Sequence, residues 1–279
     1  MAFDIPSWYF SLSMALFGLL FGSFANVVTW RLPRGESVVR PGSHCPRCGA
    51  SIAWYDNIPV LSWLVLRGRC RQCSEPISAR YPLVEAASGA LFLLAALVWG
   101  PSARALFGAA LFWFLLTLSL IDLEHMRLPN SLVGALALLG LVGVLLSQLL
   151  GQDVVPLVGI GASGLTAQPL PAAALGVLLG AGLPAAIAFA YRLIRGRSGF
   201  GMGDVKLLGA LGIFLGPYVL LTFFLASLLG ALGGAILGRG RELSQRRIPF
   251  GPWLALGAVT TAVAGPALVS GYLHLVGIV

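Results

Sequence analysis

A glycine-rich turn leads into an apolar segment, with an acid at the junction, in Ser198-Gly199-Phe200-Gly201-Met202-Gly203-Asp204-Val205-Lys206-Leu207-Leu208. Three glycines within residues 199–203 permit backbone angles that other residues resist, and they let another chain approach closely. A carboxylate at the edge of hydrocarbon is costly, so it indicates a function and a partner. A second such acid, Asp122, ends the apolar run 105–121. The sequence therefore points to a site built around Asp122 and Asp204.

Apolar residues dominate the composition. Hydrophobic residues make up 58% of the 279 positions and charged residues only 10%. A soluble globular domain carries roughly a quarter charged residues, so that class is excluded. Several apolar segments approach or exceed the ~20 residues that a helix needs to cross a bilayer. The sequence predicts an all-α polytopic membrane protein.

We predict about eight transmembrane helices. The first is too long for a signal-peptide core and lacks a basic start and a small-residue cleavage site, so we expect it to be retained. The sixth is short, and a re-entrant segment is the alternative to a full crossing. The spans are residues 8–30, 82–99, 105–121, 131–150, 171–194, 205–215, 218–237 and 250–276.

The positive charges, which give a net charge of +8, indicate how the chain is oriented in the membrane. Across eight spans, 17 of the 18 Lys and Arg residues fall in loops on one side, and only Arg104 falls on the other. The positive-inside rule makes the basic side cytoplasmic and places both termini outside. We therefore expect a lipid bilayer around the chain and no nucleic-acid partner.

Residues 31–80 form the one sizeable soluble loop, and they hold all four cysteines in two CxxC motifs with 21 residues between them. This spacing is close to that of four-thiolate zinc sites. Cytoplasmic conditions count against disulfides, and a spaced pair is more specific for metal than a single redox CxxC. The sequence predicts a structural zinc site, with neighbouring His44 as a bystander. Its ligands are Cys45, Cys48, Cys70 and Cys73.

Three further features of the first half have open readings. The amphipathic stretch 54–64 could lie on the membrane or on the helices. Glu85 is either a functional acid or, the reading we favour, a partner of Arg80 at a helix N-terminus. Asn26, a polar amide near the cytoplasmic end of the first span, is expected to face protein, water or substrate.

Topology alone brings the two aspartates to one side. If the fourth and fifth spans each cross once, Asp122 and Asp204 lie on the same face. Two close carboxylates share a proton and can act as base and acid together, which hydrolyses an amide without a covalent intermediate. Glu124 is expected to point elsewhere, whereas His125 shares the helix face of Asp122. The alternative is a helix N-cap for Asp204 and a surface charge for Asp122.

Other function classes fit the chain less well. Residues 159–164 match GxGxxG, but no strand precedes them and they lie outside, so we reject a dinucleotide site. A metalloprotease would need ligands such as HExxH. A proton-coupled transporter with a zinc-binding regulatory loop would use intramembrane carboxylates, yet we see no repeated halves. A scaffold without chemistry would not need the acid after residues 201–203.

The motifs together resemble the bacterial prepilin peptidase family, also called type IV leader peptidases, which are GxGD membrane aspartyl proteases. The likeness covers nearly the whole chain. It rests on the CxxC pair, Asp122 before Leu128-Pro129, Phe21-Gly22-Ser23-Phe24-Ala25-Asn26-Val27, Arg31-Leu32-Pro33-Arg34-Gly35, Arg80-Tyr81-Pro82-Leu83-Val84-Glu85, Gly201-Met202-Gly203-Asp204-Val205-Lys206-Leu207-Leu208 and Ile248-Pro249-Phe250-Gly251-Pro252.

The resemblance implies an inner-membrane aspartyl protease with catalytic Asp122 and Asp204 and a zinc-bound loop. Its substrates would be type IV prepilins and type II secretion pseudopilins, cut after the last leader glycine on the cytoplasmic side. Bifunctional members also methylate the new N-terminus with S-adenosylmethionine. The four cysteines and long first loop match that type, so both activities are expected, although no motif marks the methyl-donor site. Asn130 departs from the family, since many relatives have an acid there.

This reading divides the chain into three parts. Residues 1–30 form the first transmembrane helix, residues 31–80 the cytoplasmic zinc-binding loop domain, and residues 81–279 the transmembrane aspartyl protease core.

Overall fold

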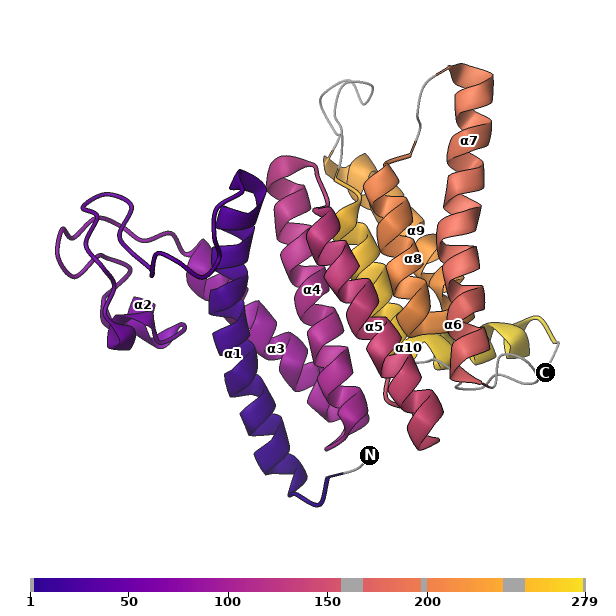
Figure 1. The fold of residues 1–279 in the computed structure, drawn as a ribbon, viewed down its shortest axis with the longest axis horizontal. Helices are drawn as coiled ribbons and strands as arrows, with labels where there is room; N and C mark the ends of the chain where they lie inside the picture. Colours follow the sequence, from indigo (N-terminus) through magenta and orange to yellow (C-terminus); the bar gives the residue numbers. More distant parts are fainter. Residues whose placement is uncertain (1–2, 157–167, 197–199, 238–248, 278–279) are drawn as a thin grey trace. The chain divides into compact units, whose positions relative to one another are not determined.

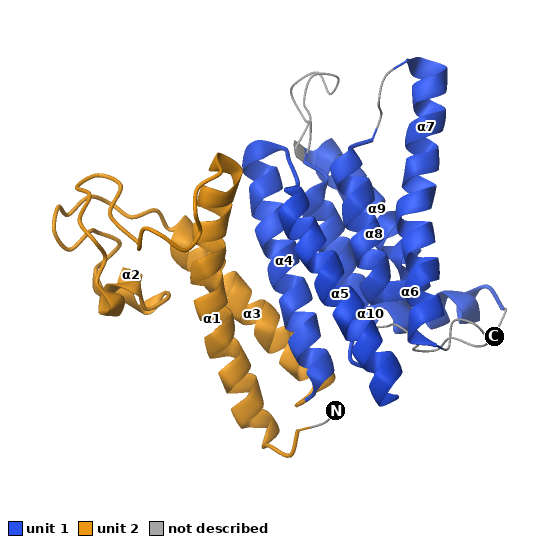
Figure 2. Cartoon of the chain, in the orientation of Figure 1, with its two compact units in different colours: residues 1, 102–279 blue, residues 2–101 orange. Residues whose placement is uncertain are grey.

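The structure, a computed structural model, describes residues 3–156, 168–196, 200–237 and 249–277 (Figure 1). These residues form helices and no β-strand, which confirms the predicted all-α class. They fall into two compact units, an N-terminal unit of residues 2–101 and a C-terminal unit of residues 102–279 (Figure 2). The GxGxxG match and most of the loop before the last helix lie outside the described residues. The division at residues 30 and 80 stays a prediction.

Two long helices build the N-terminal unit. They are α1 (Ser7–Arg31) and α3 (Arg80–Trp99), which pack antiparallel because Gly18 lies against Gly89 while Gly22 lies against Glu85. A Cβ on Gly22 would come within 2.6 Å of the Glu85 Cα, so the glycine is needed for this close approach. The loop between them carries only short turns: η1 (Leu32–Arg34), η2 (Trp54–Asn57) and α2 (Leu61–Val65).

The C-terminal unit is a bundle of apolar helices. Each predicted span in this unit corresponds to an observed helical stretch whose ends differ by no more than a few residues, although the span 171–194 is divided into α6 and α7 by a π-helical turn. The elements are α4 (Ala103–His125), α5 (Asn130–Leu150), α6 (Pro169–Val177), the π-helical turn η4 (Leu178–Gly182), α7 (Leu183–Arg195), α8 (Met202–Leu215), η5 (Gly216–Tyr218), α9 (Val219–Leu237) and α10 (Gly251–Leu275).

Helix α8 lies at the centre of this bundle. It packs against α5, α6 and η4, and its residues Leu207, Leu208 and Phe214 are among the largest fully buried side chains. Gly212 of α8 meets Gly176 of α6 backbone to backbone, and a Cβ on either glycine would run into the main chain of the other. Small residues permit this approach, as is common between membrane helices.

Seven helical stretches among the described residues are long and apolar enough to cross a membrane. One of them, Met202–Ile236, contains both α8 and α9. The backbone breaks at Gly216, which has φ +54°, and the rings of Phe200 and Phe223 lie 6.0 Å apart, so α9 folds back along α8. The predicted sixth and seventh spans are therefore separate helices. At 14 residues, α8 is about 21 Å long, shorter than the ~30 Å hydrocarbon core.

Candidate active site and metal centre

Asp122 lies in the last turn of α4, where it is buried with 6% of its surface exposed. Its Oδ2 accepts a hydrogen bond of 2.8 Å from the backbone N–H of Gly251, the first residue of α10. The helix ends just beyond it, at Met126 in the left-handed conformation. The alternative reading of Asp122 as a surface charge is therefore wrong.

Asp204 is the third residue of α8, partly buried at the helix N-terminus. The N-cap is Gly201, whose carbonyl accepts the Asp204 backbone N–H at 3.1 Å, so Asp204 is not the cap. A negative charge in the first turn interacts favourably with the helix dipole. The Asp204 carboxyl also lies close enough to Asp122 for direct electrostatic interaction. The predicted common face of the two aspartates is confirmed.

Glycines lie next to both carboxyls, where an added side chain would crowd or displace its neighbours. A Cβ on Gly251 would lie 2.8 Å from Asp122 Oδ2, and a Cβ on Gly201 would lie 2.6 Å from Asp204 Oδ2. A Cβ on Gly203 would lie 3.2 Å from the Leu128 Cβ, in the turn between α4 and α5. The glycine spacing thus lets α8 approach the end of α4 closely enough for the carboxyls to interact.

One polar contact also joins these segments. Lys206 Nζ donates to Asn130 Oδ1 at 3.0 Å, which links the fifth residue of α8 to the first residue of α5. Sequence reasoning singled out both residues for other reasons and missed this pairing, because the two are 76 positions apart. Nearby, His125 Nε2 lies 3.9 Å from a carboxylate oxygen of Glu124.

Aromatic rings connect the three segments that approach the site. The Phe200 ring lies 6.0 Å from that of Phe223 in α9 and 5.7 Å from that of Phe250, just before α10. Both pairs have the edge-to-face arrangement that aromatic rings prefer. Phe200 thus contacts α9 and the residue before α10 from the chain that precedes α8.

The four cysteines form a compact cluster in the N-terminal unit. Their Sγ atoms all lie within 4.8 Å of one another, and those of Cys45 and Cys73 are 3.8 Å apart. A tetrahedral zinc with Zn–S bonds of ~2.3 Å has sulfur atoms about 3.8 Å apart. The cluster could therefore hold a metal ion with little movement. No disulfide forms among the cysteines, and His44 lies outside the cluster.

The two CxxC motifs fold into matching turns. In the first, Cys45 N–H bonds the Ala50 carbonyl and Gly49 N–H bonds the Cys45 carbonyl; in the second, Cys70 bonds Glu75 and Ser74 bonds Cys70 in the same way. Gly49 and Ser74 occupy the same left-handed position, at φ +71° and +59°.

Backbone groups of the first turn also prepare the Cys45 sulfur for a cation. Backbone hydrogen bonds from Cys48 and Arg47 lower the pKa of the Cys45 thiol to about 6. Because the thiolate is the form that binds metal, this turn favours ligation. In the second turn a backbone hydrogen bond at Glu75 lowers the pKa of the Cys73 thiol, but burial and the neighbouring cysteine sulfur atoms outweigh it and raise that pKa to about 12.

The remaining residues of interest in the N-terminal unit hold the loop to the helices. Asn26 donates to the Tyr81 carbonyl at 3.2 Å, so it faces protein. Buried Glu85 accepts the Val60 backbone N–H at 2.7 Å and a hydrogen bond from Ser23. Sequence reasoning placed Glu85 at a helix start but did not foresee its bond to the loop.

Comparison with known proteins gives matches over both units. Residues 16–99 match the Bacterial Peptidase A24 N-terminal domain, and residues 109–235 match the Type IV leader peptidase family. The prepilin leader peptidase/N-methyltransferase of Aeromonas salmonicida strain A449 is 38% identical, with 99% of this chain and 98% of the relative aligned. The chain belongs to the type IV leader peptidase family.

Two further relatives agree with this assignment. The leader peptidase/N-methyltransferase of Pseudomonas putida is 36% identical over 98% of this chain and 96% of its own. The type 4 prepilin-like proteins leader peptide-processing enzyme of Escherichia coli O78:H11 is 38% identical over 88% of this chain and 90% of its own. No solved structure matches significantly. As a family member the chain is a peptidase, and the two profile matches fall one in each compact unit.

Proposed function

We propose that this peptidase removes the leader of type IV prepilins and type II secretion pseudopilins, with Asp122 and Asp204 as the catalytic pair. The observation that carries the proposal is the meeting of two buried or half-buried carboxyls, from α4 and α8, within interaction distance in an apolar bundle. The relatives' names supply the substrate class, and the pair supplies a chemistry that suits it.

The pair would work with water as the nucleophile. Two close carboxylates in an apolar site share one proton, so one is a base while the other is an acid. The base takes a proton from water as it attacks the peptide carbonyl carbon, and the acid donates its proton to the carbonyl oxygen. The Gly251 N–H restrains Asp122 during this exchange. As the C–N bond breaks, the aspartic acid that took the proton from water gives it to the leaving nitrogen, and the other carboxylate recovers a proton from a hydroxyl of the tetrahedral intermediate, so no covalent enzyme intermediate forms.

The side of the membrane on which cleavage occurs follows from the position of the carboxyls, and the cleavage after a glycine follows from the resemblance to the family. We place both at the cytoplasmic edge of the inner membrane, with both termini outside, on the distribution of Lys and Arg. The leader would be cut after its last glycine, at the point where a membrane-embedded substrate leaves the bilayer.

The cysteine loop would hold zinc through Cys45, Cys48, Cys70 and Cys73, the set whose sulfur spacing fits a tetrahedron. Four thiolates leave no open coordination position, so the metal's contribution is structural. The second activity would transfer a methyl group from S-adenosylmethionine to the amine that cleavage exposes. That order is required because the nitrogen belongs to a peptide bond until the leader leaves.

The test is incubation of the purified protein with a prepilin and labelled S-adenosylmethionine, followed by mass spectrometry. Leader loss and a methyl group on mature pilin are expected for the wild type, and neither for Asp204→Asn. Leader loss without methylation would support the proposed peptidase activity and contradict the proposed methyltransferase activity. Intact prepilin together with proton uptake into proteoliposomes would favour the transporter reading instead.

A further inference from the structure

Large apolar side chains are exposed along one stretch of the loop in the N-terminal unit. We call residues 52–65 the apolar turn; they include η2 and α2. Trp54 is 81% exposed and Val65 67% exposed, far beyond what the interior of a folded loop would leave. The exposed large apolar residues of the turn are Ile52, Trp54, Tyr55, Ile58, Leu61, Leu64 and Val65.

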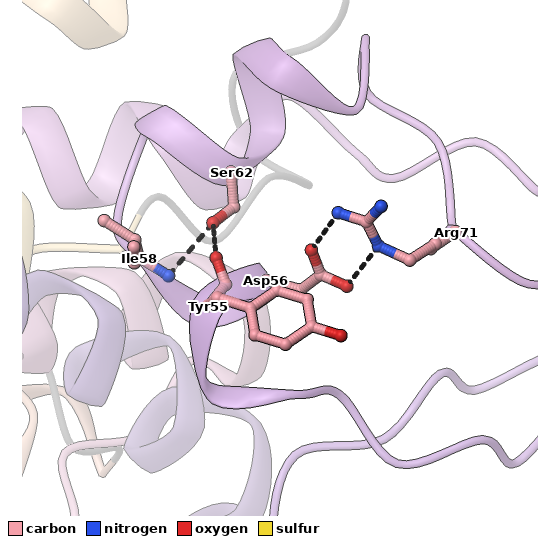
Figure 3. Close-up of polar contacts among 5 residues, drawn as sticks. All are labelled: Tyr55, Asp56, Ile58, Ser62 and Arg71. Atoms are coloured by element: carbon pink, nitrogen blue, oxygen red, sulfur yellow. Dashed lines mark hydrogen bonds and ion pairs between the residues drawn. The ribbon is translucent and has the colours of Figure 1, made fainter.

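Hydrogen bonds hold this surface in a fixed shape (Figure 3). The Ser62 hydroxyl accepts the Ile58 N–H at 3.0 Å and donates to the Tyr55 carbonyl at 2.9 Å. Arg71 forms a two-pronged bond with Asp56, at 2.7 and 2.6 Å, which lowers the pKa of that carboxyl. Because Arg71 belongs to the second CxxC motif, the apolar turn is fastened to the cysteine cluster.

A second anchor fixes the depth of the turn. The backbone N–H of Val60 donates to Glu85, which is five residues, or about 7.5 Å, into the transmembrane helix α3. Val60 is held there at φ +60°, an unusual angle for a β-branched residue. Figure 2 shows α2 alongside α1, not beyond its end. The apolar turn therefore lies beside α1 and is bonded to the second turn of α3, a helix long and apolar enough to cross a membrane.

Positive charge borders the apolar turn. Arg67 and Arg69 follow it directly, both are exposed, and neither has an acidic partner in the part of the chain that the structure describes. By contrast, Arg47 pairs with Glu75 elsewhere in the loop. Exposed tryptophan and leucine next to free arginine is the composition of segments that lie in the interface of an anionic bilayer.

We propose that the apolar turn is an interfacial membrane anchor for the cysteine loop. Trp54, Leu61, Leu64 and Val65 enter the boundary between headgroups and acyl chains, and Arg67 and Arg69 contact lipid phosphates. The anchor holds the metal-binding loop against the membrane surface. The charge and the depth of the turn favour lipid over the two other occupants of such a surface, an apolar protein substrate and a second copy of the chain.

The experiment uses the whole protein in nanodiscs of phosphatidylcholine with or without phosphatidylglycerol. Part of the lipid carries bromine near the carbonyl end of its acyl chains, which quenches nearby tryptophan. The Trp54 signal is the difference between the wild type and Trp54→Phe. We expect bromine to quench it, most strongly in the anionic discs. Replacing Arg67 or Arg69 by Gln should lower the ratio of docked to undocked turn about fivefold each in those discs.

Matched variants separate membrane contact from general damage. Leu61→Asn with Leu64→Asn should reduce the quenching, whereas Val39→Asn, at a 78% exposed apolar position outside the turn, should not. The metal content of each variant reports whether the loop keeps its fold. A Trp54 signal equally bright in brominated and plain lipid would overturn the proposal. Shielding of Trp54 only after prepilin is added would also overturn it, because the substrate would then cover the turn. Shielding only in discs that hold more than one copy of the protein would do the same, because a second copy would then cover the turn.

Discussion

Gly251 donates its backbone N–H to Asp122 Oδ2 at 2.8 Å and has no space for a side chain of its own. The two residues are 129 positions apart, and their contact joins the end of α4 to the start of α10. A buried carboxyl needs such a partner. The start of α10 is thus part of the candidate active site, where Gly251 contributes a backbone N–H and no side chain.

We predict that Gly251→Ala lowers leader cleavage by about 100-fold, the scale of effect when reacting groups shift by about 1 Å. The added Cβ would lie 2.8 Å from Asp122 Oδ2 and displace the carboxyl from its present position. The measurement is kcat for a prepilin by mass spectrometry. Gly134→Ala is the control, because a Cβ there meets nothing within 4 Å. Near-normal cleavage by the Gly251 variant would show that the contact does not position Asp122.

The aspartates themselves should each be essential. Asp122→Asn and Asp204→Asn should abolish cleavage while the protein still inserts, since an amide keeps the shape but cannot exchange the proton. Glu124→Gln is the matched control; its side chain lies against His125, and we expect a much smaller loss. Either Asp variant processing prepilin at a normal rate would contradict the paired-acid mechanism.

The Lys206–Asn130 bond should act as a positioning contact for α8. Lys206→Met and Asn130→Ala should each lower kcat several-fold, with little change in KM, and the double variant should be no worse than the poorer single variant. Such a bond to a charged donor contributes about 1.5 kcal/mol at most where it is exposed. Asn130→Asp would replace it with an ion pair and should keep full activity. Additive losses in the double variant would show that the two residues act independently.

For the cysteine cluster we expect about one zinc per chain, lost in Cys73→Ser. Methylation should suffer more than cleavage, because the aspartates belong to the other unit. Ser74→Gly should strengthen zinc retention by about 1 kcal/mol, since Ser74 holds the left-handed angle that Gly49 fills in the first turn. Competition with a chelator measures both changes. Chains isolated under reducing conditions with disulfides in place of metal would contradict this assignment.

The features that could be predicted from the sequence are those set by local patterns: apolar runs, the alternation of the chain between the two sides of the membrane, and cysteine spacing. Long apolar runs gave the helices to within a few residues, and counting crossings placed Asp122 and Asp204 on one face. The CxxC spacing predicted a four-sulfur cluster because its geometry is local and stereotyped. Those predictions needed no knowledge of how the helices pack.

Contacts between distant segments could not be predicted in this way. The bonds of Asp122 to Gly251 and of Glu85 to Val60 each use a backbone N–H, which every residue except proline has, so no residue type marks them. Gly251 belongs to one of the family motifs, but a glycine at the start of a helix has many uses. Only the packed structure shows that this one makes room for a carboxyl.

The backbone contact between Gly176 and Gly212 has a genetic consequence. Helix α8 carries Asp204 at one end and Gly212 eight residues, or about 12 Å, further along. A methyl group added at Gly212 therefore displaces the helix that positions Asp204. Random mutagenesis screened for inactive variants should therefore yield substitutions at Gly176 and Gly212 as well as at the two aspartates. Compensating second-site changes should arise among the neighbours of α6, far from any reacting atom.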